Sequence, residues 1–298
     1  MGSRTVQTIE ASEKKLGLAF LLPSSVFMLI FLFVPIAYSM YMSLFSWKLF
    51  DLGRQKEFVA LSNFLRIFSD KLFLTAAGNT LIIVVVCLFF QLVLGFLIAL
   101  ALWNIQRSMK VIHTIFLLPM ITSPVIIALI WRFIYDPQFG ILNYVLRKTF
   151  GIRGIAWLGD ISTALPSIMI VDIWQMTSFV ILILYAGLTT VPTDCVESAF
   201  VDGASYPKTV FHIIIPFILP TIFLVVILRI MDLFRIFDTI FVLTRGGPGT
   251  ATESFSTYIY KTSFIYYDMG YGMALSLITL ACIMVVSIAF IKARNARG

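Results

Sequence analysis

Charged residues are scarce in this sequence. Only 12% of the 298 residues are Asp, Glu, Lys or Arg, whereas 60% are hydrophobic. A soluble core of this size cannot bury so many apolar side chains, so most of them must contact lipid or other membrane helices. The composition therefore excludes an ordinary water-soluble globular protein.

Cysteine and histidine are also rare. The chain has three cysteines, Cys87, Cys195 and Cys282, and two histidines, His113 and His212. Their spacing matches neither a disulfide framework nor a metal site. We therefore predict no bound metal and interpret the cysteines as small packing residues.

Motifs for covalent and nucleotide chemistry are missing. The sequence has no G-x-x-x-x-G-K-[ST] phosphate loop, and the glycine-rich segment at 245–249 lacks the lysine that such a loop needs. No Ser/His/Asp, Cys/His or H-E-x-x-H arrangement is present. We predict a non-catalytic chain without a cofactor of its own. If it moves a solute uphill, the energy must come from another subunit.

The basic residues are dispersed. The net charge of +7 is not gathered on one segment, so we predict no nucleic-acid partner. An excess of Lys and Arg is typical of loops that lie over anionic lipid. The two sides of a six-span arrangement carry similar numbers of basic residues, so charge alone favours a cytoplasmic location of the termini only weakly.

Long hydrophobic runs are what the sequence has in abundance. Each is long enough for the ~20 residues that a helix needs to cross a membrane. We predict an all-α polytopic membrane protein: a cytoplasmic tail at 1–15, then one membrane domain over 16–298. Its six transmembrane helices are predicted at 16–38, 81–103, 111–134, 164–188, 208–243 and 271–291. Pro119 and Pro124 are expected to bend the third helix.

A polar linker at 192–207 separates the fourth and fifth runs. The pattern predicts a short helix from Asp194 to Phe200, capped by Asp194 with Glu197, followed by a turn at Asp202-Gly203. The expected helix places Cys195, Val196, Ala199 and Phe200 on one arc. Ser205 and Pro207 are expected to begin the next helix. Two interpretations stay open: a rigid element that a partner grips, or an amphipathic linker on lipid headgroups.

Polar residues inside two of the runs form the second candidate site. Asp172 and Gln175 lie three residues apart in the fourth run, and Arg229, Asp232 and Arg235 follow at the same spacing in the fifth. Charge in hydrocarbon usually marks an interior face. These five residues line a translocation path, form structural pairs between helices, or lie near the outer water interface. Asp238 continues the spacing, but its place near the end of the run favours a role in anchoring a loop.

Several motifs together resemble a known family. They are E-S-A-F-V-D-G-A at 197–204, L-P-M-I-T-S-P at 118–124, A-G-L-T-T-V-P at 186–192 and F-D-T-I-F-V-L-T-R-G-G-P at 237–248. The first resembles the glutamate-alanine-alanine loop of bacterial ABC importer permeases. The others resemble the carbohydrate permeases of the maltose and glycerol-3-phosphate type. The resemblance extends over nearly the whole chain.

The resemblance implies a type I ABC importer permease fold in the bacterial inner membrane, with both termini cytoplasmic. It implies three kinds of protein partner besides the lipid bilayer: a second, homologous permease, a pair of ATPase subunits that bind ATP and Mg, and an extracytoplasmic sugar-binding protein. The linker is implied to be the coupling helix that seats in the ATPase. Its residues would be Glu197, Ser198, Ala199, Asp202, Gly203 and Ala204. Ser198 departs from the alanine that is typical there, and both residues are small.

Two other classes of function remain open from the sequence. An ion-coupled secondary carrier would use Asp172 and Asp232 as relay groups. A membrane-embedded assembly protein would have no path at all. The resemblance favours neither of these. It favours a transmembrane subunit of an ATP-driven sugar importer, which forms half of the translocation path and couples to a separate ATPase through the linker at 192–207.

Overall fold

The computed structural model describes residues 20–48, 56–105, 116–152 and 154–295, with side chains up to 292. Helices dominate these residues, and the strands are two short antiparallel segments, β1 (Phe45–Ser46) and β2 (Glu57–Phe58). The predicted all-α class is confirmed. The chain divides into two compact units, one of residues 1–67 with 262–278 and the other of residues 68–261 with 279–298. The predicted tail at 1–15 lies outside the described residues.

The first unit is built around a helix that runs from Phe20 to Ser43. Its second half comprises a π-helical turn, η1 (Leu29–Phe33), and α2 (Val34–Ser43), and β1, β2 and most of α3 (Ser62–Ser69) follow. The buried Asn63 of α3 donates to the carbonyl oxygens of Ser43 at 2.8 Å and Phe45 at 3.0 Å. The side-chain amide therefore fixes the end of the apolar helix to the polar segment after it. The unit also contains most of η3 (Lys261–Ile265) and the start of α14 (Met269–Asn295).

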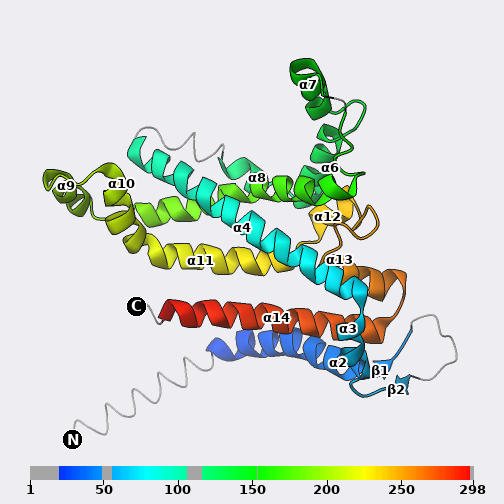
Figure 1. Ribbon diagram of the computed structural model, residues 1–298. Helices are drawn as coiled ribbons and strands as arrows, with labels where there is room; N and C mark the ends of the chain where they lie inside the picture. The colour runs from blue at the N-terminus through cyan, green and yellow to red at the C-terminus, as the bar shows by residue number, and fades with distance from the viewer. Residues whose placement is uncertain (1–19, 49–55, 106–115, 153, 296–298) are drawn as a thin grey trace, which may run out of the picture. The chain divides into compact units, whose positions relative to one another are not determined.

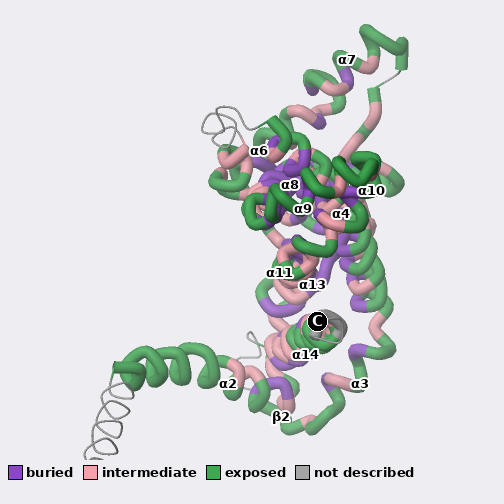
Figure 2. The backbone as a smooth tube through the Cα atoms, turned by 90° about the vertical axis from the view of Figure 1, so that its left-hand side faces the viewer, coloured by how far each residue is buried: buried purple, intermediate pink, exposed green. Residues whose placement is uncertain are grey.

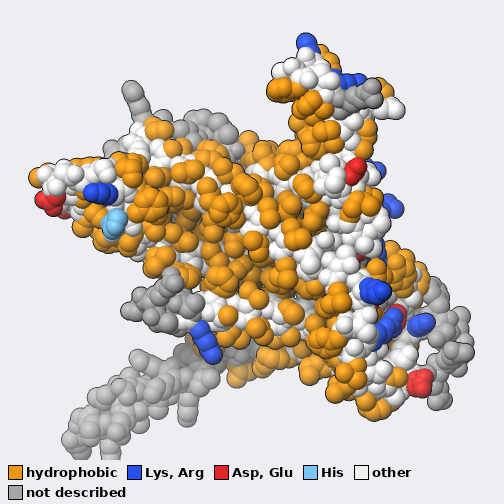
Figure 3. Space-filling model, viewed as in Figure 1, with side chains coloured by type: hydrophobic (Ala, Val, Ile, Leu, Met, Phe, Trp, Pro, Cys, Tyr) orange, Lys and Arg blue, Asp and Glu red, His pale blue; other side chains and the backbone are white. Residues whose placement is uncertain are grey.

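In the second unit, the long helices α4, α8 and α11 lie side by side (Figure 1). Buried residues lie where these helices face one another, and exposed residues cover their outer sides (Figure 2). The exposed faces of α4 and α11 are largely hydrophobic, whereas charged side chains gather near α9 and α10 (Figure 3). The elements are α4 (Lys71–Ile105), α6 (Pro124–Ile134), α7 (Ile141–Phe150), α8 (Ile161–Leu188), α9 (Thr193–Val201), α10 (Tyr206–Thr209), η2 (Val210–Ile214), α11 (Ile215–Phe234), α12 (Asp238–Leu243) and α13 (Phe255–Tyr260).

Five helices of the described residues are long and apolar enough to cross a membrane. They are Phe20–Ser43, Lys71–Ile105, Ile161–Leu188, Tyr206–Leu243 and Met269–Lys292. Part of the predicted third span, 111–115, lies outside the described residues. From Phe116 the chain is helical to Ile121, and then it breaks, rather than bending, before α6 begins at Pro124. The break arises because proline disfavours a helical residue before it, and Ser123 has an extended ψ of 134°. The count of six spans stays a prediction.

Close contact between α4 and α8 depends on a glycine. A Cβ atom on Gly95 would lie 2.6 Å from Cγ1 of Val180, and both Val180 and Ala99 are fully buried. Small residues at this spacing let two helices approach closely inside a membrane. Gly95 and Ala99, four residues apart on α4, therefore serve the packing of α4 against α8.

We expect Gly95→Ala to lower the thermal stability of the purified protein, because the added methyl group overlaps Val180 and overpacking costs about 1–3 kcal/mol. Gly78→Ala is the matched control. Gly78 lies on the same helix, and a Cβ atom there would meet no atom within 4 Å. Thermal denaturation followed by size-exclusion chromatography measures both variants. Equal midpoints for the two would contradict the packing role of Gly95.

Candidate functional site

A buried ion pair joins α8 to α11. Nη2 of Arg229 lies 2.9 Å from Oδ2 of Asp172, and the Arg229 side chain is only 1% exposed. Breaking a buried pair by removing one partner leaves an uncompensated charge, which is strongly destabilising. The pair therefore fixes these two helices to each other.

Gln91 of α4 completes the arrangement. Its Oε1 accepts a hydrogen bond from Nε of Arg229 at 3.0 Å, and its Nε2 donates to Oδ2 of Asp172 at 2.8 Å. The same Nε2 lies 3.1 Å from the backbone oxygen of Asp172. We call Gln91, Asp172 and Arg229 the polar triad. It takes one side chain from each of the three long helices and satisfies their polar groups within the bundle.

Two further charged residues, Asp232 of α11 and Arg235 directly after its end, lie at the surface. The side chains of Asp232 and Arg235 are 52% and 63% exposed, and their closest approach is 3.5 Å. Asp232 also lies 3.4 Å from Nη1 of Arg229. The expected ladder of alternating charges is therefore present up to Arg235. There α11 ends, so Asp238 lies in the first turn of α12 instead of on the same helix.

The buried and exposed charges share one cavity of about 380 Å³. All five residues predicted to line a path border it. The lining residues are Pro124, Asp172, Gln175, Met176, Arg229, Asp232, Arg235, Ile236, Phe237, Asp238 and Thr239. Nε2 of Gln175 donates to the backbone oxygen of Thr122 at 3.2 Å, which ties α8 to the break before α6. The structure thus gathers residues from three separate segments around one polar hollow.

Gln91 was not among the predicted site residues. The signal that could have identified it is its isolation, because it is the one polar residue within the apolar run 81–103. A lone amide in hydrocarbon needs a partner. The sequence does not say which helix supplies that partner.

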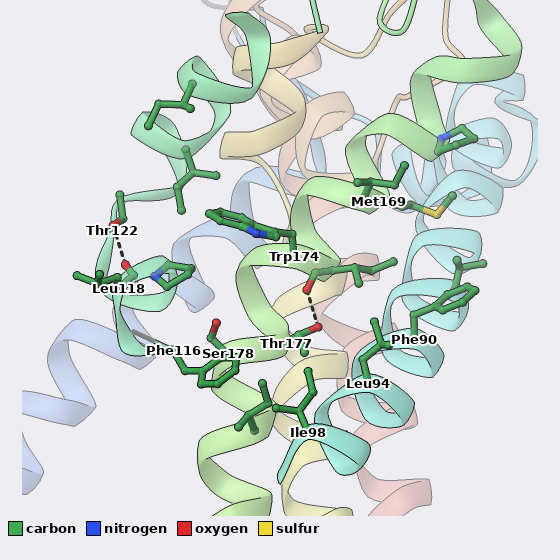
Figure 4. Close-up of a pocket in the computed structure, with 18 residues that line it drawn as sticks. Phe90, Leu94, Ile98, Phe116, Leu118, Thr122, Met169, Trp174, Thr177 and Ser178 are labelled. Carbon is green, nitrogen blue, oxygen red and sulfur yellow. Dashed lines mark hydrogen bonds between the residues drawn. The ribbon is translucent and has the colours of Figure 1, made fainter. Parts of the chain in front are cut away.

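A second, larger pocket of about 990 Å³ is almost wholly apolar. Figure 4 shows Trp174 and Met169 of α8, Phe90, Leu94 and Ile98 of α4, and Phe116 and Leu118 around it. Its few polar side chains include Thr177, whose hydroxyl donates to Ile173 O at 2.6 Å and is therefore already used. A hydrated solute would find few hydrogen-bond partners there. The polar cavity is the better candidate for contact with such a solute.

The linker between α8 and α11 forms the second part of the site. Helix α9 ends in a Schellman motif. The N–H of Ala204 donates to Ala199 O at 2.9 Å, and that of Gly203 donates to Phe200 O at 3.1 Å. Gly203 has a φ of +81°, which glycine adopts without steric cost. The predicted turn at Asp202-Gly203 and the start of α10 after Ser205 are confirmed.

The predicted cap of α9 is wrong. The N-cap residue is Pro192, without a side-chain cap, and Asp194 lies within the first turn. There its carboxylate faces the positive end of the helix dipole instead of accepting a capping hydrogen bond. The helix begins earlier than expected because proline, with its fixed φ, terminates the preceding segment.

One residue of the expected apolar arc anchors α9. Val196 is 9% exposed and belongs to the hydrophobic cluster that includes Leu188 and Val210. In contrast, Phe200 is 45% exposed and Val201 88% exposed. Outward-facing polar residues line a shallow depression on the same helix. They are Asp194, Glu197, Ser198 and Asp202. The linker is therefore held on one side and open on the other.

The comparisons with known proteins agree with this architecture. The chain is 33% identical over 295 residues to the trehalose/maltose transport system permease protein MalF of Thermococcus litoralis, covering 98% of both chains. It is 34% identical to a probable ABC transporter permease of Sinorhizobium fredii, covering 90% of this chain and 86% of that protein. Residues 91–294 match the family model of the binding-protein-dependent transport system inner membrane component. The chain belongs to this family.

Solved structures show the same fold. A bacterial ABC transporter involved in the import of the acidic polysaccharide alginate has a chain that matches with a TM-score of 0.81 at 24% identity, over 99% of both chains. A second structure, of the alginate transporter with an alginate pentasaccharide-bound periplasmic protein, matches with a TM-score of 0.80 over 94% of both chains. The predicted type I ABC importer permease fold is confirmed. The chain is a multi-pass permease of the inner membrane, in keeping with its apolar helices.

Proposed function

We propose that this chain is the transmembrane subunit of an ATP-driven sugar importer and receives motion from a separate ATPase through α9. The observation that carries the proposal is that α9 is fixed to the helix bundle on one side and exposes polar residues on the other. It is anchored by Val196, stopped by a Schellman motif at Gly203, and exposes Glu197 and Ser198 on its open side. A rigid helix with an exposed binding face can transmit a movement of the ATPase to the membrane helices, whereas a flexible loop would deform instead.

The sugar class is supported by the relatives. The Thermococcus litoralis protein is named for trehalose and maltose, and the matching solved transporter imports a polysaccharide. We assign the partners accordingly: a second permease, two ATPase subunits that hold ATP and Mg, and an extracytoplasmic sugar-binding protein. In this arrangement α9 and both termini face the cytoplasm.

The polar cavity is the proposed segment of the path. Asp232 and Arg235 are the side chains most able to meet a solute there, because both are more than half exposed. Gln175 borders the hollow but is buried, and its Nε2 donates to the backbone oxygen of Thr122. Asp172 and Arg229 act differently. Their charges are bonded to each other and to Gln91, so they hold the wall of the cavity in place.

The same geometry disfavours an ion-coupled carrier. A relay carboxylate must bind and release a proton or cation during each cycle. Oδ2 of Asp172 already accepts hydrogen bonds from Arg229 and Gln91, and Asp232 lies between Arg229 and Arg235. Each candidate carboxylate therefore has arginine as its counter-ion.

Transport measurements test the proposal directly. The chain is reconstituted into vesicles with a second permease, an ATPase and a sugar-binding protein from the same organism. We expect labelled sugar to accumulate only when all subunits and ATP are present, and to be unaffected by a protonophore. Uptake that continues without the ATPase and collapses with the proton gradient would support the carrier instead. Absence of flux in the complete complex would support an assembly role.

A further inference from the structure

Helix α7 is a separate, well-fixed feature of the second unit. It runs crosswise to α4, α8 and α11 and stands away from them (Figures 1 and 2). The fully buried Asn143 holds it to its own loop. Oδ1 of Asn143 accepts from the Ile155 N–H at 3.1 Å and from Nε1 of Trp157 at 3.0 Å, and its Nδ2 donates to Ile155 O at 2.9 Å. The orientation of α7 is therefore determined by a buried polar anchor.

This anchor turns an apolar face outwards. Ile141, Val145 and Phe150 are 55%, 45% and 68% exposed. On the helix Ile141 and Val145 lie away from Asn143 and Arg147, which contact the loop, and Lys148 borders their face because it follows Ile141 by seven residues. Phe150 follows Asn143 by seven residues and lies on the side of Asn143. Large exposed apolar side chains that are grouped on a fixed helix indicate a site of contact with lipid or with another protein.

Further exposed apolar residues precede α7 in the chain. On α6, directly before α7 in the chain, Ile130 is 52% exposed and Phe133 78% exposed. Phe139, between the two helices, is 88% exposed. Six residues separate Ile134 from Ile141, and they span at most about 20 Å when fully extended. Helix α7 therefore stays close to the end of the apolar helix α6.

The charge on α7 favours an anionic surface. Arg147 and Lys148 lie in its last turn, and the helix has no acidic residue. Arg147 keeps its position through hydrogen bonds from Nε to Asn143 O at 3.3 Å and from Nη2 to Gln138 O at 3.2 Å. Nζ of Lys148 lies 5.7 Å from the ring centre of Tyr144. Both side chains are exposed.

The two acids that flank the segment are engaged elsewhere. Asp136 accepts hydrogen bonds from the backbone N–H groups of Phe139 and Gln138, which lower its pKa. Asp160 caps α8 and accepts from the hydroxyl and backbone N–H of Ser162, which lower its pKa. Neither carboxylate pairs with the cations of α7, so these remain available to an external anion.

We propose that α7 lies in the membrane interface. Its apolar face enters the acyl-chain region, and Arg147 and Lys148 contact the headgroups of anionic phospholipids. An amphipathic helix with a basic polar side binds in this way, with about 1 kcal/mol from each cation near a charged surface. The helix would fix the end of α6 and the start of α8 relative to the bilayer.

The proposal is tested by the depth of a fluorescent label in vesicles of phosphatidylglycerol or phosphatidylcholine. The full-length chain, with Cys195 and Cys282 replaced by serine, carries an environment-sensitive dye at Val145→Cys or at Gln138→Cys. Gln138 is also exposed but precedes α7, and its backbone carbonyl accepts a hydrogen bond from Arg147. We expect severalfold stronger quenching by brominated lipid at position 145 than at 138.

The charge contribution is measured in the same vesicles. Lys148→Glu should remove most of the difference between phosphatidylglycerol and phosphatidylcholine at position 145. Lys71→Glu is the matched control, because it makes the same charge change at the start of α4 and should leave that difference intact. Equal quenching at both label positions would overturn the proposal. So would protection of the label that requires the second permease or the binding protein, since α7 would then be a protein contact.

Discussion

Replacing Gly203 with proline is expected to abolish sugar-stimulated ATP hydrolysis by the assembled importer while leaving membrane insertion intact. Proline fixes φ near −65° and has no N–H. At this position φ is +81° and the N–H donates to Phe200 O. The substitution therefore destroys the Schellman motif at the end of α9, and the helix can no longer transmit a push. ATPase activity in proteoliposomes, with and without loaded binding protein, measures the effect.

The control for this variant is Gly203→Asn. Asparagine tolerates positive φ better than other residues with a side chain and keeps the backbone N–H. It should retain most of the stimulation, since nothing lies within 4 Å of a Cβ at this position. Normal stimulation in Gly203→Pro would show that the geometry of the linker does not matter for coupling.

Removing the arginine of the polar triad is expected to cause the largest loss of stability. Arg229→Met leaves the Asp172 carboxylate buried without its counter-ion and Oε1 of Gln91 without its donor. Breaking a buried pair in this way costs about 3–5 kcal/mol. We expect little folded protein in detergent, measured as the monodisperse fraction and its thermal midpoint.

Two further variants separate structure from transport. Adding Asp172→Asn to Arg229→Met removes the orphaned charge and should recover much of the folded protein, though not full transport. Arg235→Met should fold normally, because its pair with Asp232 is exposed and such pairs contribute about 0–1 kcal/mol, yet it should reduce sugar uptake. If Arg229→Met folded as well as Arg235→Met, the triad would not be structural.

The long helices and the local turns could be predicted from the sequence. Long apolar runs appear as long helices because only helices satisfy their own backbone in lipid. The turn at Gly203 and the start of α10 at Ser205 follow from local backbone preferences, which short stretches of sequence encode. The sequence did not predict Pro192 as the N-cap of α9, because Asp194 and Glu197 have the spacing of a capping box.

The partners within the candidate site were less predictable. Spacing along one helix indicates that Arg229 can reach Asp232, three residues on, but it does not tell which helix lies opposite. The contact of Arg229 with Asp172 and Gln91 depends on how α4, α8 and α11 pack, and that packing is set by close approaches such as Gly95 against Val180. The interruption at Arg235, which separates Asp238 from the ladder, likewise depends on tertiary structure.

The most direct measurement of the central claim uses a cysteine that the chain already has. Cys195 lies exposed on α9, two residues before Glu197. With Cys282 replaced by alanine, a membrane-impermeant maleimide is applied to inside-out and right-side-out membrane vesicles. We predict that Cys195 reacts only in inside-out vesicles and is protected there when the ATPase subunits are bound. Labelling from the outer side, or labelling that the ATPase leaves unchanged, would contradict a coupling role for α9.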